Sequence, residues 1–246
     1  MKDFLNKLAS DSPTPGGGSA SAASGAMGAA LLSMVYAISR KKILKTLEKE
    51  RKEVLNIIKR EGENKAQKGE GEDKVQKRER RNRVQESKNF YEEEKTQKVL
   101  IKKLKKSADE AKMVMNKLLL LVDDDARAYE NVLRKLKKLR KIKIDDSKRE
   151  IDISKTKEDI QEAYKNAAEV TLQTAGLCHK ILKISKNLSE KVYSPVKSDF
   201  KIAISLLKVG IEGAALNVNL NLNEIDDKNF VDKKRKELNK ILKYLD

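Results

Sequence analysis

The chain has 246 residues, of which 38% are charged and only 4% aromatic, with 11 glycines, 3 prolines and no tryptophan. This composition favours helices, because the long alternations of β-branched and aromatic residues that strands need are missing. The single cysteine, Cys178, excludes an internal disulfide and a cysteine-based zinc site. An intracellular, cytoplasmic protein is therefore expected, with no secretory signal peptide at its start.

The net charge of +17 is unevenly distributed along the chain. Residues 41–106 carry 23 Lys/Arg against 13 Asp/Glu, a net charge of +10 in roughly a quarter of the sequence. A basic surface attracts polyanions such as nucleic acid or acidic lipid. No aromatic platform for stacked bases accompanies the charge, so nucleic acid is not the expected partner.

The first elements are a short amphipathic helix over residues 2–9 and a Pro/Gly loop over residues 10–18. Ser19 is predicted to cap a helix that covers residues 20–42 or more. That helix is rich in small residues, which indicates that another helix or a ligand approaches it closely. The uncharged run over residues 12–39 contains too much Pro, Gly, Ala and Ser to be a predicted membrane span.

The middle of the chain is predicted to contain an insertion at about residues 43–95. Its first part can continue as an exposed amphipathic helix, but residues 61–83 are polar and are expected to be disordered or a mobile, solvated arm. Further helices are predicted at about 95–140, 157–190, 200–217 and 228–245, with Ser198 or Asp199 as a cap. The predicted fold is an all-α bundle of long antiparallel helices, one domain over residues 1–246 with the mobile basic insertion.

The loop and helix start around GGGSAS suggest a ligand site. A phosphate-binding P-loop is excluded because no Lys directly precedes a Ser or Thr here, and no strand precedes the glycines as in a dinucleotide fold. What remains is a glycine turn that presents backbone N–H groups at a helix N-terminus. Such a turn suits a carboxylate, a phosphate or a developing negative charge, but it can equally be structural.

Two further segments contain residues suited to chemistry. In VDDDARAYENVL, Asp125 and Tyr129 lie four residues apart on a packing face, which suits proton transfer or ligand contact. A solvated acidic turn is the simpler reading of these residues alone. Asp199 and the asparagines of NVNLNL have equally ordinary roles at helix ends. The only histidine, His179, cannot build a histidine-based metal site, so no metal is expected.

Four segments in their order along the chain resemble the cyclodeaminase/cyclohydrolase family of folate enzymes. They are FLNKLASDSPTPGGGSASAASGAMGAALLSMV (4–35), LLLLVDDDARAYENVL (118–133), AAEVTLQTAGLC (167–178) and SDFKIAISLLKVGIEGAALNVNLNL (198–222). SDSPTPGGGSASA is the most specific motif, and DxDAxAY and SDxxxA followed by NVxxNL support it. The resemblance covers most of the chain except residues 43–95 and part of 137–156.

The resemblance implies a dimeric helical bundle, or a higher homo-oligomer, that acts on the one-carbon unit between N5 and N10 of tetrahydrofolate. In one reaction of the family, formiminotetrahydrofolate cyclises and releases ammonia. In the other, water opens 5,10-methenyltetrahydrofolate. Both need proton shuttling and orientation, so no cofactor is implied beyond the folate substrate itself. The alternative is a non-catalytic helical scaffold whose basic arm binds nucleic acid or an acidic membrane.

The resemblance also implies roles for individual residues. Asp199 or Asp125 is the implied general acid/base, with Tyr129 orienting the substrate. The implied binding residues hold the pterin, the carboxylate-bearing portion or the polyglutamate tail, and they are Ser12, Gly16, Gly17, Gly18, Ser19, Arg40, Lys41, Lys42, Asn217 and Asn221. Two positions depart from the family: Ser39 replaces a frequent glycine, and the loop YSPVKSD replaces an Asn/Gly-rich turn.

Overall fold

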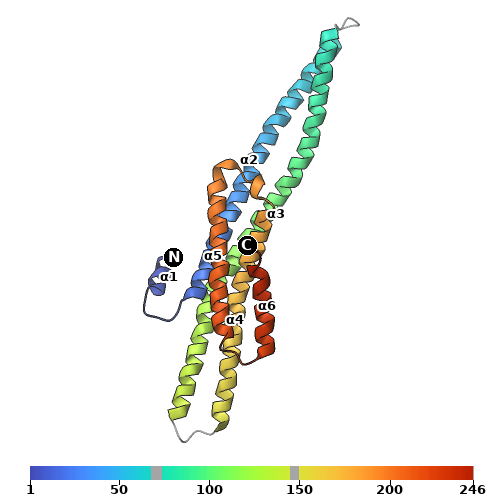
Figure 1. Ribbon diagram of the computed structural model, residues 1–246. Helices are drawn as coiled ribbons and strands as arrows, with labels where there is room; N and C mark the ends of the chain where they lie inside the picture. The colour runs from blue at the N-terminus through green and yellow to red at the C-terminus, as the bar shows by residue number, and fades with distance from the viewer. Residues whose placement is uncertain (68–73, 145–149, 246) are drawn as a thin grey trace.

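The structure is a computed structural model that describes residues 1–67, 74–144 and 150–245. All regular elements in these ranges are helical, which confirms the all-α prediction (Figure 1). They are α1 (Lys2–Leu8), α2 (Gly17–Gln67), α3 (Lys74–Ile144), α4 (Glu150–Lys186), α5 (Lys197–Leu222), α6 (Lys228–Leu242) and the short 3-10 helices η1 (Ser189–Lys191) and η2 (Ser194–Val196). Helix α2 packs on α3 and α5, α4 packs on the same two helices, and α6 lies against α4 and α5.

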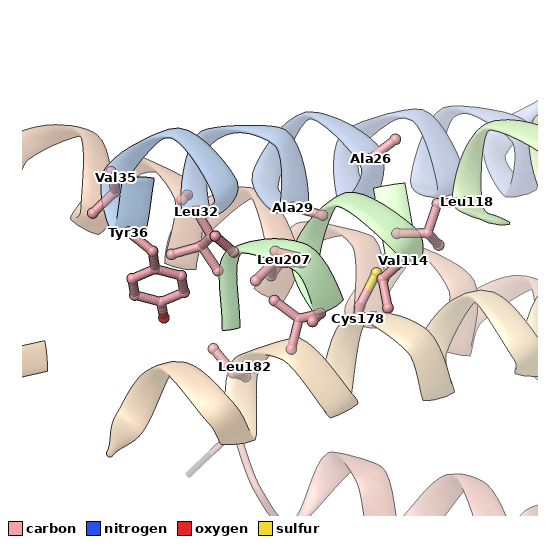
Figure 2. Packing of buried hydrophobic residues seen from close by; sticks show 14 of the residues in the cluster. Ala26, Ala29, Leu32, Val35, Tyr36, Val114, Leu118, Cys178, Leu182 and Leu207 are labelled. Atoms are coloured by element: carbon pink, nitrogen blue, oxygen red, sulfur yellow. The ribbon is translucent and has the colours of Figure 1, made fainter. Parts of the chain in front are cut away.

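The main core lies where α2, α3, α4 and α5 meet (Figure 2). Leu32 and Tyr36 of α2 are fully buried, and the Tyr36 hydroxyl donates a hydrogen bond to Ser185 Oγ at 3.0 Å. The small residues of α2 serve close packing, as predicted. A Cβ on Gly28 would lie 2.9 Å from the carbonyl oxygen of Ala203 in α5, so only glycine permits this helix separation.

Cys178 of α4 is also part of this core (Figure 2), and its sulfur lies next to Gly25 of α2. Burial raises the pKa of the Cys178 thiol to about 12. The thiol is therefore protonated at neutral pH and behaves as a small apolar group in the core.

The basic insertion is a pair of helices in the structure, formed by the end of α2 and the start of α3, and it extends away from the bundle (Figure 1). The prediction of a disordered arm is wrong for residues 61–67 and 74–83, which are helical; residues 68–73 lie outside the described ranges. Lys, Arg and Glu are good helix formers, and pairs such as Lys98 with Glu94, at 3.1 Å, support exposed helices. That the insertion is mobile stays a prediction.

Four predicted helix starts are wrong, and the first is that of α3, which begins at Lys74 and not near residue 95. Helix α2 begins at Gly17, where the Ala20 N–H donates to the Gly16 carbonyl at 3.0 Å, so Ser19 lies inside the first turn and is not the cap. Helix α5 begins at Lys197 without a side-chain cap, so Ser198 and Asp199 lie in its first turn. Helix α4 begins at Glu150, earlier than predicted.

Two segments, Gly17–Arg60 and Ser194–Leu222, are long and apolar enough to cross a membrane by length and composition alone. The core helices of soluble proteins pass the same test, and 56% of the apolar window in the first segment is buried inside the bundle. The absence of a membrane span therefore stays a prediction, and the packing of the first segment supports it.

Candidate active site

A cavity of about 310 Å³ lies at the end of the bundle where α2 begins and α5 ends. Its walls come from the loop before α2, the first turn of α2, the last third of α3, the first half of α4, and the end of α5 with the turn that follows it. The lining residues are Pro13, Thr14, Gly16, Gly17, Gly18, Asp125, Tyr129, Tyr164, Ala167, Asn217, Leu220, Asn221 and Glu224. Seven of the thirteen predicted site residues therefore line one cavity, although they come from three separate segments of the chain.

The glycine turn forms one wall because it leaves room for polar side chains of other helices. A Cβ on Gly17 would lie 3.2 Å from Nδ2 of Asn217, and a Cβ on Gly18 would lie 2.6 Å from Cγ of Asp125 and overlap Oδ1 of that carboxyl. The loop before the turn is tied to α3, since the Thr14 hydroxyl donates to Glu130 Oε1 at 2.8 Å. The glycines thus allow Asp125 to reach the cavity directly beneath the helix start.

Asp125 is the most deeply placed acid of the cavity. Its Oδ2 lies 2.8 Å from the Ser19 hydroxyl, and that hydroxyl oxygen also lies 2.9 Å from the backbone carbonyl oxygen of Val122. Burial raises the pKa of Asp125 above its usual range, and hydrogen bonds from the Ser19 hydroxyl and backbone N–H partly oppose this rise. A partly desolvated carboxyl of this kind is suited to taking up and returning a proton.

Two tyrosines and a second acid share the cavity with Asp125. Tyr129 is one turn further along α3 and is 40% exposed, while Tyr164 comes from α4 and Glu224 follows α5. The pKa of Tyr164 is raised by burial, and also by the negative charge of Glu224 and by Tyr129. Tyr164 and Glu224 were not predicted from the sequence, because each is a single residue outside the recognisable motifs.

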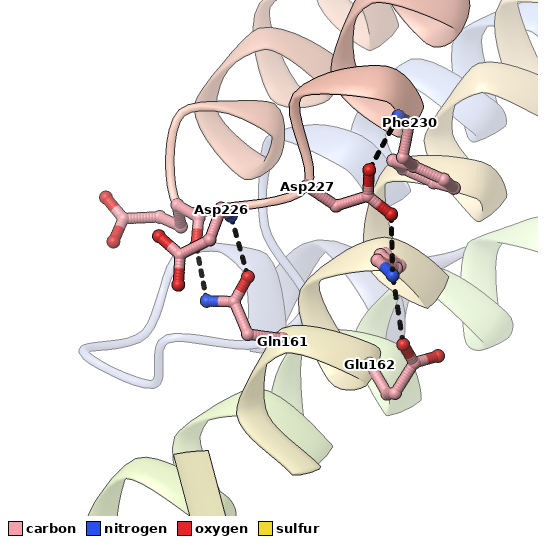
Figure 3. Close-up of polar contacts among 7 residues, drawn as sticks. Gln161, Glu162, Asp226, Asp227 and Phe230 are labelled. Atoms are coloured by element: carbon pink, nitrogen blue, oxygen red, sulfur yellow. Dashed lines mark hydrogen bonds and ion pairs between the residues drawn. The ribbon is translucent and has the colours of Figure 1, made fainter. Parts of the chain in front are cut away.

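The turn that carries Glu224 is fixed to α4 by polar contacts (Figure 3). The Gln161 side chain donates to the Glu224 carbonyl at 3.0 Å and accepts from the Asp226 N–H at 2.8 Å. Asp227 caps α6 through the Phe230 N–H, at 3.0 Å, and lies 3.2 Å from Lys165 Nζ of α4. These contacts hold the rim of the cavity in place next to Tyr164.

Asn217 and Asn221 lie four residues apart, so both face the cavity from the last turns of α5. The Asn217 amide donates to the Gly213 carbonyl at 2.9 Å, which fixes its orientation and leaves its Oδ1 as an acceptor near the glycine turn. Asn219, two residues from each, is exposed. The pair therefore offers amide groups to a ligand from the side opposite Asp125.

The other predicted site residues do not line this cavity. Ser12 lies in the adjoining hollow under α1, and the Ser19 side chain lies behind Asp125. Arg40, Lys41 and Lys42 are about 33 Å further along α2 from Gly18, and Asp199 is about 27 Å from Asn217 along α5, at 1.5 Å per residue. Within one chain, Asp199 and the three cations thus lie far from this cavity.

The cavity is acidic although the protein is strongly basic. Asp125 and Glu224 line it, and none of its described lining residues is a lysine or an arginine. Among the described residues, no group of three or more His, Cys, Asp or Glu side chains is arranged to hold a metal ion. Such a cavity offers two acids, two phenols and two amides for hydrogen bonding and proton transfer to a neutral or cationic ligand.

A helical bundle that holds a desolvated acid in a polar cavity has the architecture of an acid–base enzyme. Comparison with known proteins supports this class. The sequence profile of the formiminotransferase-cyclodeaminase family matches residues 1–73 and 84–240, and the chain belongs to this family. It is thus a member of a family of folate cyclodeaminases and cyclohydrolases, as the motifs implied.

Two relatives illustrate the similarity. The methenyltetrahydrofolate cyclohydrolase of Methylorubrum extorquens is 29% identical over 244 residues, which cover 98% of this chain and 88% of that protein. The crystal structure of formiminotetrahydrofolate cyclodeaminase from Thermotoga maritima matches with a TM-score of 0.60 and 21% identity, over 98% of this chain and 87% of the other. The second likeness concerns the fold alone.

Proposed function

We propose that this protein acts on the one-carbon bridge between N5 and N10 of tetrahydrofolate, as a methenyltetrahydrofolate cyclohydrolase. The acidic cavity is the observation that carries this proposal. In 5,10-methenyltetrahydrofolate the bridging carbon is part of a cationic N–C–N group. A cavity lined by Asp125 and Glu224, with no lysine or arginine among its described lining residues, attracts such a cation even in a chain of net charge +17.

In the proposed reaction, Asp125 is the proton-transferring group. As water bonds to the methenyl carbon, one of its protons passes to the Asp125 carboxylate, which leaves a neutral tetrahedral adduct. The bond from carbon to N5 then breaks while Asp125 returns this proton to N5. The hydroxyl proton of the adduct leaves to solvent, and the product is 10-formyltetrahydrofolate.

The cyclodeaminase reaction would use the same carboxyl in the same order. When N10 attacks a protonated formimino group, Asp125 takes the N10 proton and then gives it to the departing ammonia. We propose hydrolysis in preference to deamination, because a cyclohydrolase, that of M. extorquens, is 29% identical over nearly the whole chain. Asn217, Tyr129 and Tyr164 surround the cavity and would orient the bridge between the two nitrogens.

The test is a parallel assay of the purified chain with 5,10-methenyltetrahydrofolate and formiminotetrahydrofolate. We expect loss of the methenyl absorbance well above the uncatalysed rate, and little ammonia from the formimino compound. Faster ammonia release would reassign the protein as a cyclodeaminase. No turnover of either compound, together with salt-dependent nucleic-acid binding that deletion of residues 60–88 removes, would favour the scaffold alternative.

We also propose that the protein is a homodimer through the outer face of α2 and α5. Two helices that pack on each other leave apolar side chains uncovered there. On α5, Ile202, Val209 and Leu216 recur every seven residues and are 52%, 53% and 68% exposed. Met27 and Met34, also seven apart, continue the patch on α2 with 43% and 40% exposure. Rows of exposed apolar side chains on two helices that pack on each other are typical of a subunit interface.

The dimer is tested by light scattering or sedimentation of a charged variant. We expect Val209→Glu combined with Leu216→Glu to convert a dimer into a folded monomer, because two buried charges at an interface cost far more than the contacts contribute. Val99→Glu is the matched control, since Val99 is 54% exposed on α3 and lies outside this face. A wild-type chain that is monomeric at micromolar concentration would contradict the proposal.

A further inference from the structure

The Ser19 hydroxyl has two acceptors but only one hydrogen. Its Oγ lies 2.9 Å from the Val122 carbonyl oxygen and 2.8 Å from Oδ2 of Asp125, both ordinary hydrogen-bond distances. A hydroxyl donates one hydrogen bond and can accept others, whereas a backbone carbonyl only accepts. Both contacts are therefore hydrogen bonds at the same time only when Asp125 is protonated and donates to Ser19 while Ser19 donates to Val122.

When Asp125 is ionised, the same atoms allow a second arrangement. The Ser19 hydrogen then points to Oδ2 of Asp125, and Val122 keeps only the backbone hydrogen bond of its own helix. The change requires rotation of one hydroxyl hydrogen and no movement of a heavy atom. Because Ser19 is fully buried, no bulk water competes for either arrangement.

We propose that Ser19 is a positioning residue that holds the Asp125 carboxyl in one place in both of its protonation states, by turning its hydroxyl hydrogen between Val122 and Asp125. The inference rests on the proposed function, in which one carboxyl first takes a proton and then returns it. Oδ1 of Asp125 faces the glycine turn, so this oxygen can meet a ligand while Ser19 holds Oδ2. Ser19 itself does not line the cavity and touches no substrate.

Other groups near Asp125 do not offer this role. The titratable residues that line the cavity with it are Tyr129 of α3, Tyr164 of α4 and Glu224 after α5, whereas the loop and the first turn of α2 contribute none. The described hydrogen bonds of the Asp125 carboxyl come from Ser19 alone. Loss of this hydroxyl would therefore remove the side-chain hydrogen bond that orients the acid.

The test compares Ser19→Ala with Ser33→Ala. Ser33 is a matched control, because its hydroxyl in α2 also donates to a backbone carbonyl of α3, that of Ala108, at 3.0 Å. This hydrogen bond involves no carboxylate. We expect Ser19→Ala to lower kcat about 10-fold to 100-fold with KM within about twofold, the usual effect of a hydrogen bond to a charged group. Ser33→Ala should keep wild-type turnover.

A second readout needs no substrate and is thus independent of the proposed function. Carbon-13 NMR follows the Asp125 carboxyl, assigned as the signal that disappears in Asp125→Asn. Without the Ser19 hydroxyl, the ionised form loses a charge-assisted hydrogen bond, whereas the neutral form loses only a weaker neutral one. The Asp125 titration should therefore move to higher pH in Ser19→Ala and stay in place in Ser33→Ala. If Ser19→Ala does not fold, Ser19→Cys, a weaker donor of similar size, should give the same shift to a smaller degree.

An unchanged Asp125 titration in the Ser19 variant would overturn the inference, whatever the turnover. A fall of kcat that is equal in the Ser19 and Ser33 variants would also overturn it, because the effect would then be general to the contact between α2 and α3. If wild-type protein turns over neither folate but the titration still moves, the proposed function fails while the pairing of Ser19 with Asp125 stands.

Discussion

Asp125→Asn is expected to lower turnover of the folate substrate by at least about 100-fold, the range found when a general acid–base group is removed. Asparagine has the shape of the carboxyl and can still meet the Ser19 hydroxyl, so the cavity should keep its form. It cannot exchange a proton with the substrate. The expected pattern is a fall in kcat with a much smaller change in KM, measured by the methenyl absorbance assay.

The same variant should be at least as stable as the wild type at neutral pH. Because burial raises the pKa of Asp125 in the folded chain, its favourable contribution is present below the unfolded-state pKa and is lost as the pH rises through the folded-state value. Asparagine does not ionise, so the variant does not lose folding stability as the pH rises through this value. In urea unfolding, the advantage of the variant over the wild type should therefore shrink as the pH falls.

Asp123→Asn is the matched control for the activity measurement. Asp123 belongs to the same acidic run but is exposed and lies outside the cavity. Its variant should keep turnover within about twofold, as is usual for a surface substitution that touches no special feature. An Asp125→Asn enzyme with normal kcat would remove Asp125 as the acid–base group and return attention to Asp199, which one chain places far from the cavity.

Much of the fold could be predicted, because the presence of a helix depends on composition and on the spacing of apolar residues, and both can be read from the sequence. The polar part of the basic insertion, residues 61–83, could not, because its few apolar residues resemble a disordered chain when they are read alone. In the structure, two such segments lie next to each other as α2 and α3, and Leu47 is only 8% exposed. Packing of the two helices against each other provides the stabilisation that neither segment has as an isolated helix.

The site was predictable where its residues repeat a motif and not where tertiary packing brings in a single residue. Asp125 with Tyr129, and Asn217 with Asn221, have helical spacing, whereas Tyr164 reaches the cavity only because α4 packs between α3 and α5. No spacing in the sequence predicts such an approach.

The two positions where the resemblance implies a departure from the family, Ser39 and the loop YSPVKSD, touch each other in the structure. The buried Ser39 hydroxyl donates to Val35 at 2.8 Å and accepts the backbone N–H of Tyr193, in the altered loop, at 3.0 Å. A glycine at this position could not accept that hydrogen bond. The serine thus satisfies the loop backbone of this chain, and two differences that look independent in the sequence form one local change.

Gly18→Ala is expected to reduce turnover about as strongly as Asp125→Asn, although it adds a single methyl group and removes no functional group. The new Cβ would lie 2.6 Å from Cγ of Asp125, so the carboxyl would have to leave Ser19. The unfolding free energy should also fall, by about 1–3 kcal/mol, the usual cost of overpacking. Gly176→Ala, in open space on α4, should instead gain up to about 1 kcal/mol from helix propensity.

A double-mutant cycle separates this overlap from a general effect on the helix start. In an Asp125→Ala background the overlapping carboxyl is absent, so Gly18→Ala should cost little stability there. The coupling between the two positions should then account for most of the loss seen with Gly18→Ala alone. An equal cost in both backgrounds would place the effect in the backbone of the glycine turn. Gly18 would then be needed for the backbone conformation of the turn. It would not be needed to make room for the Asp125 carboxyl.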